Sequence, residues 1–315
     1  MRVFTSFIIF VCLFAIALRS YAEEAPAETP TEVAVESDNA AESGAESTAP
    51  TQTRPKHILP PSEYQIASAD LLRYAPETEI KSLIAGESQF TALISEQDGS
   101  VIRGSALLLP DISLHPNQSA TFYQLRYALN QYGWISVAGI MPEIMHQQLK
   151  DELQLKQLIE RPNNTLDVVL EDTQKQYINQ LQLVMSSMLE EASAYPGLRM
   201  IVAQGATAGW LVEGLASQQL EMPDVLVLIS PYLPDQKLNQ KLPAKIAQLP
   251  VPILDVWSER DNPWAKATVM ARKKASKRYL TMHYRQRELF GFRGLETTDA
   301  RLGKEIYGYV TYLGW

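Results

Sequence analysis

Short apolar runs alternate with amphipathic stretches along the chain from about residue 62 to its end. The clearest runs, which are apolar at most positions, are Leu198–Ala203, Val225–Ile229 and Pro252–Trp257. A strand with apolar side chains on both faces must be covered on both faces, as in parallel sheets whose connections are helices. The alternation therefore predicts the α/β class, with a mostly parallel central sheet and helices on both faces. Ligands of such folds bind beyond the carboxyl ends of the strands.

Hydrophobic periodicity and capping residues locate the individual elements. The expected strands are Phe90–Ile94, Val101–Leu109, Trp134–Ile140, Leu198–Ala203, Val225–Ile229, Pro252–Trp257 and about Arg278–Arg285. The expected helices are Ser62–Tyr74, Ala120–Gln131, Asp151–Glu160, Leu166–Ala194, Thr207–Ser217, Asp235–Gln248, Pro263–Lys277 and about Thr298–Leu313. We see no internal repeat and no domain break after residue 60.

The first 22 residues have the pattern of a secretory signal peptide. Arg2 precedes the apolar stretch Phe7–Leu18, which is short for a membrane span, and Ser20-Tyr21-Ala22 fits a cleavage site. We expect cleavage after Ala22 and export to the periplasm or the medium; the alternative is an uncleaved N-terminal anchor. Cleavage would also remove the single cysteine, Cys12.

Residues 23–56 differ in composition from the rest of the chain. Residues 23–53 are rich in Ala, Glu, Ser, Thr and Pro, and they contain eight acidic residues and no basic one. Such a segment cannot bury enough apolar surface to offset its ordering entropy, so we expect a disordered acidic linker. It would act as a solvated spacer or as an interaction tail. The folded domain is expected over residues 57–315.

Charge and cysteine content exclude several classes of protein. The formal net charge is -8, and loss of Arg2 and Arg19 would make it -8 - 2 = -10, which argues against a nucleic-acid partner. One cysteine excludes a disulfide scaffold and a multi-cysteine zinc site. Metal-binding, dinucleotide-binding and phosphate-loop motifs are missing from the sequence, so we expect no metal and no cofactor.

The sharpest motif is Gly205-Ala-Thr-Ala-Gly209, which follows an expected strand and precedes an expected helix. This strand–turn–helix context is that of the nucleophile elbow, G-x-S-x-G, in which small residues allow a tight turn. Thr207 stands at the nucleophile position of this pattern. Its other interpretation is a structural turn residue.

This motif, together with the stretches Gly104–Asp111, Tyr132–Trp134 and Val251–Asp261, resembles the α/β-hydrolase superfamily. More closely, the chain is similar to an uncharacterised family of secreted Gram-negative bacterial proteins with that fold. The resemblance implies a nucleophile at Thr207 and an acid at Asp261, with Glu259 close by. It also implies a histidine in the loop after the last strand.

That histidine is missing, because residues 288–292 read Glu-Leu-Phe-Gly-Phe. The tentative substitutes are His115, in a loop at the ligand-binding edge, and His283, within the last expected strand. Loop bracing and sheet packing are their structural interpretations, and helix capping is that of Asp261. A hydroxyl nucleophile needs an adjacent base, and a β-branched residue tolerates a strained elbow poorly. We therefore interpret the triad as degenerate.

Eight basic residues and no acidic one lie between residues 262 and 287. They form a solvated helix face or a peripheral contact with anionic surfaces. The residues considered for such a contact are Lys266, Arg272, Lys273, Lys274, Lys277 and Arg278.

Three hypotheses on function follow. The first is a non-catalytic binding or envelope-associated protein, a pseudoenzyme with an unknown small-molecule or envelope ligand. The second is a periplasmic ester or amide hydrolase, with an atypical nucleophile at Thr207. The third is an anion-binding module for acidic lipid or glycan.

Overall fold

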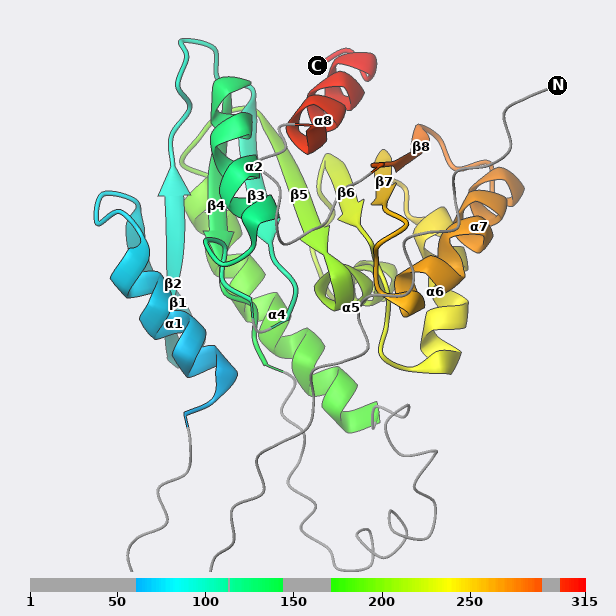
Figure 1. Ribbon diagram of the computed structural model, residues 1–315, viewed down its shortest axis with the longest axis horizontal. Coiled ribbons are helices and arrows are strands. Elements are labelled where there is room, and N and C mark those ends of the chain that lie inside the picture. The colour runs from blue at the N-terminus through cyan, green and yellow to red at the C-terminus, as the bar shows by residue number, and fades with distance from the viewer. Residues whose placement is uncertain (1–60, 113, 144–170, 291–300) are drawn as a thin grey trace, which may run out of the picture. The chain divides into compact units, whose positions relative to one another are not determined.

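The computed structural model describes residues 61–112, 114–143, 171–290 and 301–315. These residues fall within one compact unit, residues 58–315, built on an eight-stranded sheet (Figure 1). The strand order is β1-β2-β4-β3-β5-β6-β7-β8. The mostly parallel sheet with helices on both faces confirms the predicted fold class. The expected signal peptide and linker lie outside the described residues.

The sheet is antiparallel at one end and parallel over the rest. β1 pairs with β2 and β2 with β4 in antiparallel register, whereas every pair from β4 through β8 is parallel. The strand bounds are β1 Ile80–Ala85, β2 Ser88–Ser95, β3 Gly104–Leu109, β4 Trp134–Gly139, β5 Leu198–Gln204, β6 Val225–Ile229, β7 Ile253–Trp257 and β8 Tyr284–Glu288. The parallel strands place their carboxyl ends at one edge of the sheet.

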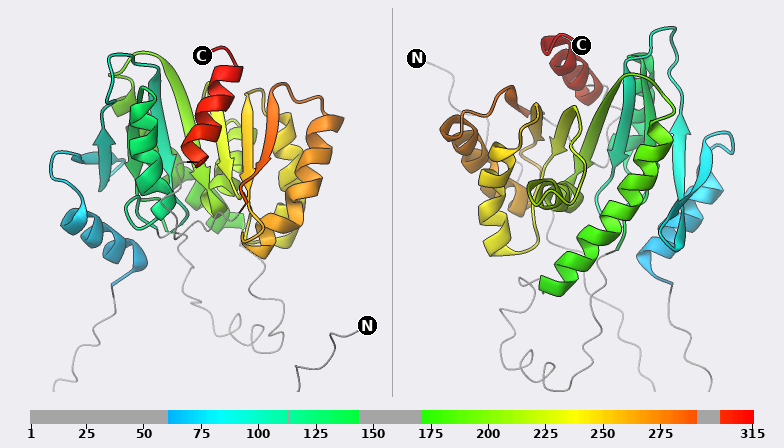
Figure 2. Two further views of the ribbon diagram at one scale, coloured as in Figure 1. Left: turned by 45° about the horizontal axis from the view of Figure 1, so that its top comes forward. Right: turned by 180° about the vertical axis from the view of Figure 1, so that it is seen from behind.

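Two hydrophobic cores cover the two faces. One contains α1 Glu63–Tyr74, α2 Ala120–Gln131 and α8 Arg301–Tyr312. The other contains α4 Glu171–Ala192, α5 Gly205–Ala216 and α6 Gln236–Gln248, against which α7 Pro263–Arg278 packs (Figure 2). β5 serves both cores, because Ile201 and Ala203 face one and Met200 and Val202 the other. None of the described helices is long and apolar enough to cross a membrane.

Local capping explains why several helices start where the sequence predicts. Ser62 caps α1, and its hydroxyl and the Gln65 side chain form a reciprocal capping box. The carboxylate of Asp235 accepts a hydrogen bond from the Leu238 N–H at the start of α6. α7 starts with the Asn262 cap followed by Pro263 at its first position. This cap is Asn262 and not Asp261, so the capping interpretation of Asp261 is wrong.

Two strands differ from the prediction. β1 was not expected, because its side chains are mostly exposed at the edge of the sheet and give no continuous apolar signal. The last strand, expected at Arg278–Arg285, is β8 at Tyr284–Glu288, because α7 continues to Arg278. The expected helix Asp151–Glu160 lies outside the described residues.

A buried ion pair joins α7 to the sheet. Arg272 is fully buried, and its Nε donates to Asp255 Oδ2 at 2.8 Å. The same oxygen accepts hydrogen bonds from the Tyr284 hydroxyl and from Gln286 Nε2. Arg272 therefore has no access to solvent, and its assignment to an anion-contacting surface is wrong. The sequence alone did not reveal that the Arg272 side chain of α7 is buried against β7.

Arg272→Met is expected to destabilise the protein by about 3–5 kcal/mol, because it leaves the Asp255 carboxylate buried without its cationic partner. Urea unfolding measures the loss. Lys273→Met, at the exposed neighbouring position, is the matched control and is expected to change stability by about 0.5 kcal/mol or less. Equal effects of the two substitutions would show that the buried pair contributes nothing specific.

Candidate functional site

The elbow between β5 and α5 is present, and its apex is Gly205. Gly205 has a φ of 62°, in the left-handed region that glycine adopts without strain. It follows the last strand residue, Gln204, directly and opens α5. Thr207 lies two residues further on, inside the first turn of α5 and fully buried. The placement of Thr207 at the apex is therefore corrected: the sharp turn belongs to a residue without a side chain.

Asp111 fills the space that a side chain at the apex would take. It follows β3, the strand that pairs with β5, so the two strand ends lie side by side at the carboxyl edge. A Cβ atom added to Gly205 would collide with both carboxylate oxygens of Asp111. Two separate reasons therefore require glycine at the apex: the backbone angle and the space taken by the neighbouring carboxylate.

Two backbone N–H groups hold the Asp111 carboxylate in this position. Oδ1 accepts from the N–H of Ala206 at 2.8 Å and from that of Ile112 at 2.9 Å. In the α/β-hydrolase elbow, the N–H after the nucleophile and an N–H of the loop after β3 form the oxyanion hole. Ala206 and Ile112 occupy these two places. Both N–H groups are therefore already bound to a side chain of this chain.

The surroundings of Asp111 are buried and carry two tyrosines. Burial raises the pKa of Asp111, and the N–H groups of Ile112, Ala206 and Thr207 partly oppose that rise. Tyr177 on α4 is fully buried, and desolvation raises its pKa, with a further contribution from Asp111. Burial, with a smaller contribution from Asp111, also raises the pKa of Tyr232 to about 12. Both phenols are therefore neutral hydrogen-bonding groups at neutral pH.

Asp261 lies in the loop after β7 and is bound to a serine instead of a histidine. Its Oδ2 accepts from the Ser230 hydroxyl at 2.5 Å and from the Ser258 N–H at 2.6 Å. Burial raises the pKa of Asp261, and these two hydrogen bonds lower it again in part. Ser230 directly follows β6 and has a φ of 50°, an uncommon angle for serine. Glu259 is exposed, and its backbone carbonyl accepts a hydrogen bond from Lys266 Nζ at 3.2 Å.

Among the contacts that the structure describes, neither candidate histidine binds a residue of the elbow. His115 is buried and its Nδ1 accepts from the Gln118 N–H at 3.0 Å, which braces the loop before α2. Burial lowers its pKa, and the charge that opposes this comes from Asp70 on α1. His283 is exposed, at the amino end of β8, where its ring packs edge-on against Tyr312. Because β8 runs parallel to β5, His283 lies at the edge of the sheet opposite the elbow.

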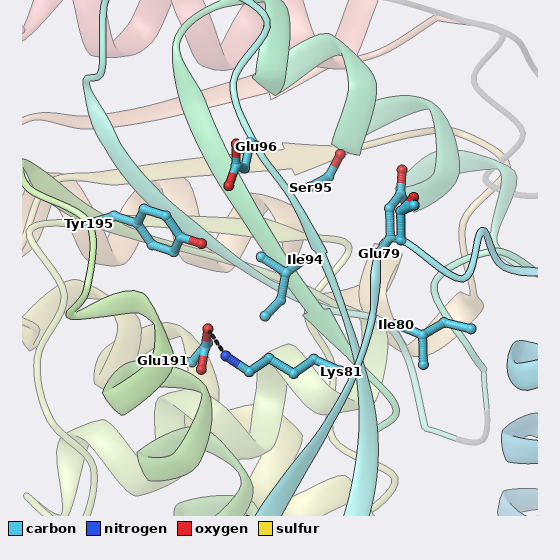
Figure 3. Close-up of a pocket in the computed structure, with 9 residues that line it drawn as sticks. Glu79, Ile80, Lys81, Ile94, Ser95, Glu96, Glu191 and Tyr195 are labelled. Carbon is cyan, nitrogen blue, oxygen red and sulfur yellow. Dashed lines mark hydrogen bonds and ion pairs between the residues drawn. The ribbon is translucent and has the colours of Figure 1, made fainter.

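A separate open pocket of about 400 Å³ lies at the antiparallel end of the sheet (Figure 3). Glu79, Lys81, Glu96, Glu191 and Tyr195 line it. Lys81 Nζ pairs with Glu191 at 2.6 Å across it, and Arg126 binds Glu79. Two of the three glutamates of the pocket are thus paired, and the pocket lies on β1, β2 and α4, away from the elbow. Among the described residues, no group of three or more metal-binding side chains comes together.

Sequence reasoning missed Asp111, Gly205, Tyr177 and Tyr232. Two signals could have found the first two. Asp111 follows a fully buried strand, at the edge where α/β folds bind ligands. Gly205 is the first glycine after β5, and the positive φ of an elbow favours glycine over threonine. The tyrosines come from α4 and from the loop after β6, and only the tertiary fold brings them to Asp111.

Comparison with known proteins agrees with the fold. Residues 4–311 match the family described as protein of unknown function (DUF3530). No curated protein matches the chain.

Solved structures similar to the chain include three α/β hydrolases. They are a dienelactone hydrolase from Anabaena variabilis (11% identity, 74% of this chain and 96% of that chain covered, TM-score 0.50), Est1E from Butyrivibrio proteoclasticus (8%, 74% and 98%, 0.53) and a soluble variant of monoglyceride lipase from Saccharomyces cerevisiae (10%, 74% and 94%, 0.50). At such low identities the similarity concerns the fold alone. It confirms the resemblance to the α/β-hydrolase superfamily.

Gly205→Ala is expected to destabilise the protein by about 3 kcal/mol, because it combines a strained backbone angle with a collision against Asp111. In an Asp111→Ala background the same change should cost only about 1 kcal/mol, the backbone part. Urea unfolding of the two single variants and the double variant gives the coupling energy, expected near 2 kcal/mol. Gly99→Ala, whose added Cβ would meet nothing, is the control. Strictly additive effects would contradict the contact between Asp111 and the apex.

Removal of the buried charge with Asp111→Asn should change how stability depends on pH. Because burial raises the folded-state pKa of Asp111, the folded protein holds this proton more tightly than the unfolded chain does. Wild type should therefore gain stability over the variant as the pH falls from 7 toward the unfolded-state pKa of about 4. We expect the difference in Tm to move by about 2–4 °C in favour of wild type. A difference that moves the other way would show that the hydrogen bonds outweigh the burial.

Proposed function

We propose that this chain, which belongs to the family described as protein of unknown function (DUF3530), is a non-catalytic binding protein on the α/β-hydrolase fold. Its ligand would be a small molecule or an envelope component that reaches the carboxyl edge of the sheet. In this proposal the elbow is retained as a turn and its hydrolytic chemistry is lost.

The occupied elbow is the observation that carries the proposal. Serine-type hydrolysis needs a side-chain nucleophile at the apex, a base beside it and an empty oxyanion hole. Gly205 supplies no nucleophile. The carboxylate of Asp111 accepts hydrogen bonds from the two N–H groups that would stabilise an oxyanion. A substrate carbonyl would have to displace a hydrogen-bonded carboxylate before any reaction began.

The alternative of a hydrolase with Thr207 as nucleophile finds less support. Thr207 is buried in α5 beside Tyr177, and Asp261 is bound to Ser230 and Ser258. His115 braces its own loop, and His283 lies at the opposite edge of the sheet. The four tentative catalytic residues therefore do not form a proton-transfer chain among the described contacts.

Export is the second part of the proposal. Its support is the sequence pattern of residues 1–22, a basic residue, a short apolar stretch and a small-residue cleavage site. A cysteine-free mature chain suits the periplasm or the medium, because it does not depend on the redox state of either.

Hydrolysis of a series of p-nitrophenyl esters with graded acyl chains tests the loss of catalysis. We expect purified protein from residue 23 onward to release nitrophenol no faster than Asp111→Asn and Thr207→Val. The three proteins should also fail to react with a fluorophosphonate probe, which labels activated hydroxyl nucleophiles.

Each positive result would identify a different enzyme. Turnover that disappears in Thr207→Val would make Thr207 the nucleophile and overturn the proposal. Turnover that disappears in Asp111→Asn, with Thr207→Val still active, would make the Asp111 carboxylate the reacting group. Thermal unfolding of both variants at the same pH shows whether a lost activity reflects a lost fold.

A further inference from the structure

We propose that the turn between α7 and β8 docks onto a bilayer surface rich in anionic lipids. Leu280 and Met282 would enter the interface, and Lys274, Lys277 and Arg278 would contact the headgroups. This surface lies at the amino end of β8, so the inference does not depend on what the elbow does.

Two apolar side chains project from this turn without a packing partner in the core. Leu280 is 83% exposed and Met282 is 75% exposed, among the most exposed large apolar side chains of the described residues. Leu280 also has a φ of 53°, which is an uncommon backbone conformation for leucine. An exposed leucine held at an unfavourable angle contributes little to the packing of the described residues. Such an outlier is a reason to look for a function at that position.

The turn is held firmly, so its exposed side chains are not those of a loose loop. The Thr281 hydroxyl donates to the Ala247 carbonyl of α6 at 2.5 Å, and its N–H donates to Ser276. The Tyr309 hydroxyl of α8 donates to the His283 carbonyl. Residues 281 and 283 are thus anchored, and the alternating residues 280 and 282 point outward.

A stripe of exposed cations directly precedes the apolar pair along the chain. Lys273, Lys274, Lys277 and Arg278 are exposed on the last two turns of α7. Among the described ion pairs, none involves these four residues. The neighbouring acid on α8, Glu305, is already paired with Arg287 at 3.3 Å. The surface therefore presents uncompensated positive charge beside exposed apolar side chains.

Aromatic residues complete the composition expected of an interfacial surface. Tyr279 is 43% exposed beneath Arg278, and Tyr312 at the end of α8 is 65% exposed and packs near His283 and Arg285. Tyrosines favour the headgroup level of a bilayer, where their rings and hydroxyls meet different surroundings. Lys266 does not belong to this surface, because it lies 12 residues before Arg278, about 18 Å away along α7.

An anionic bilayer fits this surface better than an acidic glycan or the acidic residues 23–53. Each of these three candidates would neutralise the cations, and each would bind less tightly as salt screens the charges. Only a bilayer gives Leu280 and Met282 an apolar environment. The combination of cations with exposed aliphatic and aromatic side chains is that of surface-bound membrane proteins.

Co-sedimentation with vesicles tests the proposal on the chain from residue 23 onward. We expect binding to vesicles of phosphatidylcholine mixed with phosphatidylglycerol, and much weaker binding to phosphatidylcholine alone. Lys274→Gln/Lys277→Gln/Arg278→Gln should weaken binding on the order of 100-fold, about fivefold for each cation removed. Leu280→Asn/Met282→Gln should weaken it about tenfold or more, and asparagine suits the backbone angle at residue 280.

Matched controls lie elsewhere on the surface. Lys237→Gln/Lys241→Gln removes two exposed charges from α6, and Ile84→Gln removes an exposed aliphatic side chain from β1. Both should bind within about twofold of wild type, with unchanged thermal unfolding in every variant. No binding to anionic vesicles, or equal losses in the controls, would overturn the proposal. Binding that falls in the charge variant but not in Leu280→Asn/Met282→Gln would overturn it too, because the contact would then be electrostatic alone, without insertion of the apolar side chains.

Discussion

The hydrogen bonds from the Ile112 and Ala206 N–H groups to Asp111 Oδ1 join the loop after β3 to the helix after β5. Helix α5 begins at a turn that needs glycine, and its first free N–H groups point toward that turn. In an enzyme of this fold these donors stabilise the negative charge that develops in the transition state. Here a permanent side chain of the protein satisfies them. One carboxylate thus contributes to the stability of the turn and, in the function we propose, leaves no free donors there for acyl transfer.

Asp255 is a fully buried carboxylate, and its contrast with the partly buried Asp111 is informative. Asp255 lies within β7 and is neutralised by Arg272, with Tyr284 and Gln286 as further donors. Among the described residues no cation pairs with Asp111, which depends on backbone N–H groups and on its place at the edge of the sheet. A carboxylate in the interior of a sheet needs a counter-charge, whereas one at a helix start is favoured by the helix dipole. Their different roles follow from these positions.

Much of the fold could be predicted from residue patterns, because most strands are fully buried and most helices have recognisable caps. Helix α2 and strand β6 have the predicted bounds, and α6 starts at the predicted cap. β1 and β8 were missed or misplaced since edge strands have mixed, partly exposed side chains. The site was predicted only as an elbow at a given place in the chain. Its apex was assigned two residues too late, because G-x-S-x-G was matched by its glycines and not by the backbone angle.

The rest of the site depends on contacts that no local pattern contains. Asp111 and Gly205 are 94 residues apart in the chain and meet because β3 and β5 are neighbours. The burial of Arg272 was hidden in a run of similar basic residues, of which only one faces the sheet. The residue type predicted a charge at position 272. The direction in which this residue points from the helix axis decides whether its charge faces solvent or Asp255.

The pairing of Asp111 with Gly205 also limits how the sequence can change over time. A serine codon at position 205 is one nucleotide away from some glycine codons, yet the new side chain would collide with the carboxylate. Asp111 would have to be lost first, in a step that by itself leaves two backbone donors unsatisfied. A serine at the apex therefore requires ordered changes at two distant positions, and the first of them supplies no nucleophile. Because of this dependence, we expect Gly205 and Asp111 to be retained together during evolution.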